Sequence, residues 1–101
     1  MSSLASLPTL HTLSQICANP DALMQQLRYR NNGDPVLLLQ DAVLMAQQPR
    51  FSDSLNQLQL YILNDDLVAR GVTIAPNVNA TIIDYSQFVQ LTLNTQQQVA
   101  W

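Results

Sequence analysis

The stretch PVLLLQ, residues 35–40, decides the fold class of this chain. Its four central residues are apolar and follow one another without the polar alternation of a half-exposed strand. A run of this kind is typical of a strand that is covered on both faces in a parallel sheet. We therefore expect a buried central strand here.

Strand-like and helix-like segments alternate on both sides of this strand. Further strands are expected over residues 9–13, 58–63, 81–83 and 98–101. Helices are expected over residues 20–31, 41–48, 64–70 and 85–92, with a loop or short helix over 51–56. This alternation implies right-handed crossovers and a three-layer α/β/α fold around a mainly parallel sheet.

Capping residues mark where the helices begin and end. Asn19 can cap the first helix, which is expected to end before the Asn-Gly pair at residues 32–33. Asn64 and the two acids after it open a short helix that Gly71 terminates. Asp84 and Gln87 form a box-like cap for the last helix.

The chain of 101 residues has the size of one domain. We expect a flexible extension over residues 1–8 and a single domain over residues 9–101. The longest apolar runs are too short to cross a bilayer, and the first residues lack the pattern of a secretory signal. One cysteine cannot form an internal disulfide framework, so a cytoplasmic location is expected.

The charges argue against direct binding to nucleic acid. All four basic residues are Arg, all seven acids are Asp, and the formal net charge is -3. A protein that grips a nucleic-acid backbone needs a basic patch, which four scattered arginines do not make. If the chain serves an RNA-modifying system, another subunit should supply the basic surface.

Several kinds of site are excluded by composition. Two glycines cannot build a phosphate-binding loop or a dinucleotide fingerprint, and no serine has the flanking glycines of a nucleophile elbow. One Cys and one His do not make a tetrahedral zinc site without other chains or an unusual set of carboxylates. No bound cofactor or metal is expected.

Polar residues follow three of the expected strands, at the sheet edge where open α/β folds place their ligand sites. These residues are Gln40, Asp41, Asn64, Asp65, Asp66 and Asp84. A carboxylate cluster at this edge could perform acid-base chemistry. Each acid also begins a helix, however, where it satisfies free N–H groups and the helix dipole, and we favour this capping interpretation.

Two other side chains are candidates for chemistry. His11 lies within the first expected strand, where a hydrogen-bonded structural role is favoured over catalysis. Cys17 precedes the Asn19 cap, and a helix N-terminus could lower its pKa and expose a reactive thiolate. Because no Lys or Arg is close in sequence, we favour a buried, inert thiol. Cys17 remains the one candidate catalytic residue.

Five segments, in order and spacing, resemble the DsrH/TusB-like family. They are Leu10-His11-Thr12, LLLQDAV (37–43), YILNDDLVARG (61–71), IDYSQFVQLT (83–92) and the final QVAW (98–101). The resemblance covers nearly all of the chain from Leu10 onward. It implies a five-stranded parallel sheet of the DsrEFH-like kind.

The resemblance also implies partners. Members of this family assemble with two related subunits, resembling TusC and TusD, into a complex with two copies of each chain. In the TusB-like branch the complex passes persulfide sulfur from a cysteine desulfurase system towards a TusE-like partner and the tRNA thiouridylase, for 2-thiouridine at the tRNA wobble position. In the DsrH-like branch the same architecture serves sulfur oxidation.

The chain departs from the family pattern at two places. DsrH-like members carry a cysteine in the first helix, at a position that falls near Gln26 here, and the main acceptor cysteine belongs to the TusD-like chain. The residues through Pro8 also extend beyond the usual start. The first departure favours the TusB-like branch and a non-catalytic, structural subunit. The alternatives are a direct persulfide carrier through Cys17, a DsrH-like subunit in sulfur oxidation, or a small-ligand enzyme that uses the strand-end aspartates.

Overall fold

A parallel sheet of five strands runs through the computed structural model, which describes residues 7–101. The strands are β1 (Thr9–Leu13), β2 (Pro35–Leu38), β3 (Gln59–Leu63), β4 (Thr81–Ile83) and β5 (Gln97–Ala100). They lie in the order β4-β3-β2-β1-β5, and every adjacent pair is parallel. The predicted central strand is therefore β2, and all four of its residues are buried.

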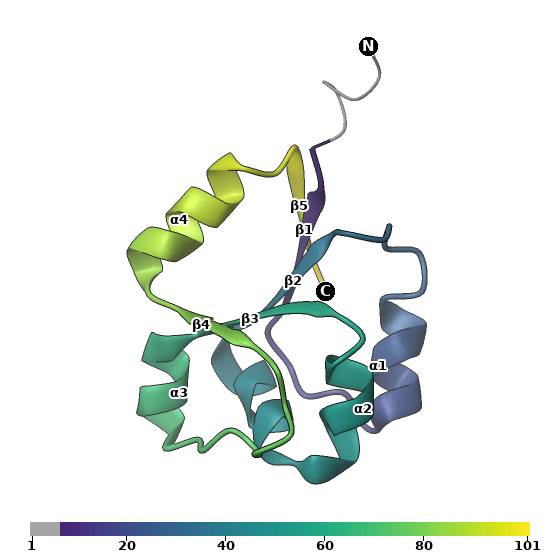
Figure 1. Cartoon of the computed structure of the whole chain (residues 1–101), viewed down its shortest axis with the longest axis vertical. Coiled ribbons are helices and arrows are strands. Elements are labelled where there is room, and N and C mark those ends of the chain that lie inside the picture. Colours follow the sequence, from purple (N-terminus) through teal and green to yellow (C-terminus); the bar gives the residue numbers. More distant parts are fainter. Residues whose placement is uncertain (1–6) are drawn as a thin grey trace.

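Helices cover both faces of the sheet, as Figure 1 shows, which confirms the predicted α/β/α fold. The helical segments are α1 (Pro20–Gln26), the 3₁₀ helices η2 (Gln40–Gln47) and η3 (Pro49–Phe51), α2 (Ser52–Leu55), α3 (Asn64–Arg70) and α4 (Tyr85–Leu93). The chain winds from β1 through β2 and β3 to β4 at one edge of the sheet and then returns by α4 to β5 at the opposite edge. No helix among residues 7–101 is long and apolar enough to cross a membrane.

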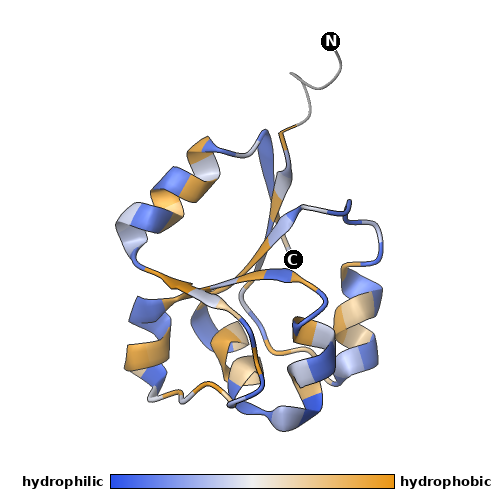
Figure 2. Cartoon of the chain, viewed as in Figure 1, coloured by the Kyte–Doolittle hydropathy of each residue, from blue (hydrophilic) through white to orange (hydrophobic). Residues whose placement is uncertain are grey.

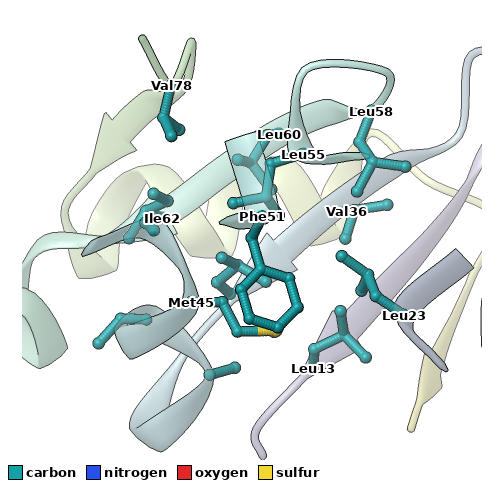
Figure 3. Close-up of a cluster of buried hydrophobic side chains, with 14 of the residues drawn as sticks. Leu13, Leu23, Val36, Met45, Phe51, Leu55, Leu58, Leu60, Ile62 and Val78 are labelled. Carbon is teal, nitrogen blue, oxygen red and sulfur yellow. The ribbon is translucent and has the colours of Figure 1, made fainter. Parts of the chain in front are cut away.

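The hydrophobic cores on the two faces of the sheet differ in size. Phe51 and Met45 lie at the centre of the larger one, between the sheet and the helices α1, η2 and α2 (Figure 3). The smaller one contains Leu10, Leu37, Leu63 and Ile83, under α4. One face of the sheet is therefore well covered and the other is covered by a single described helix.

The prediction for the end of the first helix is wrong. The helix ends at Gln26, with Leu27 as its cap, and residues 27–29 form a turn. The backbone N–H of Asn31 donates to the Asp34 carboxylate, and the N–H of Asp34 donates to the Asn31 carbonyl. Just after Gln26 the helical pattern gives way to three-residue turns, in which the N–H of Arg28 donates to the carbonyl of Gln25 and the N–H of Arg30 to that of Leu27. Tyr and Asn, which follow at residues 29, 31 and 32, are weak helix formers.

The expected cap of α3 is also wrong. The N-cap position is Leu63, whose side chain has no acceptor, so no side chain caps the helix. The Asp66 carboxylate accepts hydrogen bonds from Gln40 and Arg70 instead. The capping box of Asp84 and Gln87 is confirmed, and so is Gly71 as the left-handed end of α3, with φ of 60°.

The predicted N-terminal extension lies mostly outside the described residues. Residues 1–6 are not described, whereas the carbonyl of Pro8 accepts a hydrogen bond of 2.9 Å from the N–H of Gln96, next to β5. Pro8 therefore continues the pairing of β1 with the last strand.

Candidate functional site

Cys17 lies in the loop between β1 and α1, at the carboxyl end of the sheet. Its side chain is 8% exposed, and its Sγ donates a hydrogen bond of 3.4 Å to Oε1 of Gln26. Burial raises the pKa of the Cys17 thiol. A buried thiol with a raised pKa is a poor nucleophile, because the thiolate is the reactive form. The geometry favours the inert interpretation of Cys17.

Arg70 joins two of the strand-end acids. Its Nε donates to Asp41 at 2.9 Å and its Nη1 donates to Asp66 at 3.2 Å. The hydrogen bond to Asp41 and the charges of both acids raise the pKa of Arg70. The predicted carboxylate cluster therefore exists in part, but a guanidinium compensates both of these charges, which leaves neither acid free as a general base.

The same cluster holds the backbone after β2 in an unusual conformation. Gln40 has φ of 50°, in the left-handed region that non-glycine residues rarely adopt, and its N–H donates to Asp66 at 2.7 Å. Such a residue costs on the order of 1–3 kcal/mol and persists only where the surroundings hold it. Asp66 thus positions the β2 to η2 turn, which is a structural role.

The remaining candidate acids lie apart from this cluster. Asp84 caps α4 through the N–H of Gln87, and Asp65 is exposed at the start of α3. Within residues 7–101 there is no group of three or more His, Cys, Asp or Glu side chains that could hold a metal ion. The acids that the structure brings together are therefore Asp41 and Asp66.

The most extensive buried polar network was not predicted from the sequence. His11 Nε2 lies 3.0 Å from Oδ2 of Asp34, and Trp101 Nε1 donates a hydrogen bond of 3.2 Å to Nδ1 of His11. Since Nδ1 accepts, we assign the proton of the neutral ring to Nε2, which donates to Asp34. His11 is thus a hydrogen-bonded structural residue, as predicted, and both of its ring nitrogens are in use.

Asp34 is the centre of this network. Its carboxylate also accepts the N–H groups of Thr9, at 3.0 Å, and of Asn31, at 3.0 Å. Burial alone would raise the pKa of Asp34, but the hydrogen bonds from His11, Thr9 and Asn31 outweigh burial and lower that pKa below its ordinary value. The sequence signal that could have pointed to this network is the acidic residue directly before the buried strand.

We expect Asp34→Asn to lower the free energy of unfolding at pH 7 by about 2–3 kcal/mol. The substitution replaces one carboxylate oxygen by an NH2 group, which cannot accept a hydrogen bond from the surrounding N–H donors. The folded pKa of Asp34 is depressed, so its contribution is complete above the unfolded value of about 4 and is lost as the pH falls through the folded value. Urea unfolding at pH 7 and pH 3 should show that the difference in free energy of unfolding between the parent and the variant is smaller at pH 3. Asp53→Asn, at an exposed acid in α2, is the control; a gap that stays constant with pH would contradict this account.

Two surface hollows lie away from the candidate side chains at the carboxyl edge. One hollow of about 480 Å³ lies at the opposite end of β1 and β2, between Pro8, Gly33, Asp34 and Gln96. Another of about 470 Å³ lies along the start of β3 and β4. Neither contains Cys17, Asp41 or Asp66. Neither of these two hollows therefore serves as a substrate cleft for the three residues.

Sequence comparison places the chain in a family. A family model described as DsrH like protein matches residues 17–98. Proteins named TusB from Yersinia pestis and Yersinia pseudotuberculosis are 41% identical to the chain over 95 residues, which cover 91% of this chain and 99% of theirs. The chain belongs to the DsrH-like family. The resemblance found in the five sequence segments is thus confirmed.

Solved structures support the fold of this DsrH-like chain. The crystal structure of the ychN protein from E. coli matches with a TM-score of 0.69 and 14% identity, over 93% of this chain and 99% of that one. The NMR structure of Tm0979 from Thermotoga maritima matches with a TM-score of 0.52 and 23% identity, over 81% and 91% of the two chains. At these identities the two likenesses establish a shared α/β fold and nothing more.

Proposed function

We propose that this DsrH-like chain is a non-catalytic subunit of a cytoplasmic sulfur relay. In this proposal it assembles with TusC-like and TusD-like chains, two copies of each, and the complex passes persulfide sulfur to a TusE-like acceptor for 2-thiolation of the tRNA wobble uridine. The observation that carries the proposal is the 41% identity to proteins named TusB, over almost the whole of both chains.

The state of the single cysteine supports a structural role within that relay. Cys17 is the chain's only cysteine, and its thiol is buried with a raised pKa. A sulfur carrier needs an accessible thiolate that attacks a donor persulfide and later releases the outer sulfur. The thiol lies against Gln26, near which the resemblance places the first-helix cysteine of the DsrH-like branch. The first helix of this chain, α1, contains no cysteine.

The arginines support the assignment of tRNA contact to other chains. Arg70 is held between two acids, and Arg30 Nη2 donates to the carbonyl of Gln57. Arg50 donates to Gln48, and Arg28 lies over the ring of Tyr29. Arg28 and Arg30 share the loop after α1, whereas Arg50 lies in η3 and Arg70 in α3, so the four side chains do not form the basic stripe that a phosphate backbone requires.

Co-production tests the proposed assembly. The chain is produced together with the TusC-like and TusD-like chains of its own organism, and the purified material is measured by size-exclusion chromatography with light scattering. We expect one species with the mass of two copies of each chain. Recovery of this chain alone, while the other two form a complex of their own, would contradict the proposal.

A further inference from the structure

His11 and Trp101 form the part of the buried polar network that lies at the β5 edge of the sheet. His11 is 6% exposed, in β1, which pairs with β2 on one side and with β5 on the other. Trp101 follows β5 directly and is 40% exposed. The chain contains one histidine and one tryptophan, so each partner of this contact can be followed separately by spectroscopy.

The hydrogen bonds fix where the neutral His11 ring carries its proton. The indole N–H of Trp101 can only donate, so Nδ1 of His11, which lies 3.2 Å away, accepts and carries no proton. Nε2 then carries the proton and donates to Asp34 at 3.0 Å. A second proton can therefore be added only at Nδ1, which is the nitrogen that the indole of Trp101 occupies.

Protonation of His11 would place two hydrogen-bond donors against each other. In the imidazolium cation both ring nitrogens donate, so no rotation of the His11 ring restores an acceptor for Trp101. The two rings are nearly parallel, at 15°, and their centroids are 6.0 Å apart, which is the outer limit for attraction of a cation to an aromatic face. The indole group that lies against Nδ1 is the N–H, at the positive edge of the ring. The cation therefore destabilises this contact.

The charges around His11 favour a cation that stays in place. Within residues 7–101, Asp34 is the one acidic group at ion-pair distance from His11. Burial would raise the pKa of Asp34, but its hydrogen bonds lower that pKa, so its carboxylate is ionised in the range where histidines take up a proton. β2 and β5 contain no charged side chain. In α1 and the loop after it, Asp21 and Arg28 are exposed and Arg30 donates to backbone carbonyls.

Trp101 is held less firmly than His11. No residue of β5 is fully buried, and Figure 2 shows that this strand begins with hydrophilic residues. Apart from the indole hydrogen bond, Trp101 is attached through its backbone N–H, which donates to the carbonyl of Thr12 at 2.9 Å. We infer that protonation of His11 releases the Trp101 side chain from the sheet edge, so that this contact is a pH-sensitive switch that uncovers the pair of His11 and Asp34. The inference does not depend on the proposed function.

Acrylamide quenching of tryptophan fluorescence, measured on the full chain, tests this inference. Acrylamide is uncharged, so its access to Trp101 does not follow the charge of the protein. We expect the Stern–Volmer constant of the parent to rise by about twofold between pH 8 and pH 5.5, because an indole that is 40% exposed becomes almost fully exposed. His11→Asn should show no such rise, because its side-chain oxygen can accept the indole N–H but takes up no proton. Circular dichroism at both pH values checks that each protein is folded.

Nuclear magnetic resonance of the parent chain decides the question if His11→Asn does not fold. The ring protons of the one histidine and the indole N–H of the one tryptophan should change over the same pH interval, with a common midpoint. Three results overturn the inference: a Stern–Volmer constant that does not change in the parent, an equal rise in folded His11→Asn, or different midpoints for the two resonance signals.

Discussion

A chain shortened to end at Gln98 is expected to lose about 3 kcal/mol of stability and to melt roughly 10 °C or more below the full chain. The removed residues pair with β1, where Val99 lies opposite His11 and Ala100 opposite Thr12. The N–H of Trp101 also donates to the carbonyl of Thr12, and its ring stacks on His11 with centroids 6.0 Å apart. Truncation therefore removes half of an edge strand and uncovers a buried polar network.

Thermal melting followed by circular dichroism measures this loss, and Trp101→Phe separates its causes. Phenylalanine keeps most of the apolar contact but lacks the N–H that donates to Nδ1 of His11, so we expect a smaller loss of about 1 kcal/mol. Equal melting temperatures for the truncated and full chains would show that β5 does not contribute to the stability of the sheet.

Local patterns were sufficient to predict the strands of the sheet. The apolar run at residues 35–40 predicted a strand that is buried on both faces, and this strand is β2, at the centre of the sheet. Capping residues predicted where α4 begins and where α3 ends, because a cap depends only on residues within one turn. These features are short-range, so a single sequence contains the information for them.

Contacts between distant segments were not predictable in the same way. Asp34 forms a turn with Asn31 in the loop after α1, and its carboxylate binds the N–H of Thr9 and the ring of His11, which are more than 20 residues away. Arg70 binds Asp41, which is 29 residues away in the sequence. The expected cluster of acids is therefore an ion-pair network. Strand order decides these pairings, and periodicity does not reveal strand order.

Loss of the whole chain is expected to remove wobble 2-thiouridine from tRNA, whereas Cys17→Ser is expected to keep it near the normal level. In the proposed relay, a complex without this subunit would lack a component of its scaffold, so sulfur would not reach the thiouridylase. Serine fits the Cys17 site, because the thiol is small, buried and hydrogen-bonded to Gln26, and a hydroxyl can make the same hydrogen bond. The alternative in which Cys17 carries a persulfide makes the opposite prediction, since a carrier cannot work without its sulfur atom.

Mass spectrometry of nucleosides from digested tRNA provides the most direct test of the central claim, that this chain supports sulfur transfer without carrying sulfur itself. Three strains are compared: one with the parent gene, one without the gene, and one with Cys17→Ser at normal abundance in the assembled complex. We predict abundant 2-thiouridine in the first and third strains and none in the second. Normal 2-thiouridine in the strain without the gene, or its loss in the Cys17→Ser strain, would contradict the account.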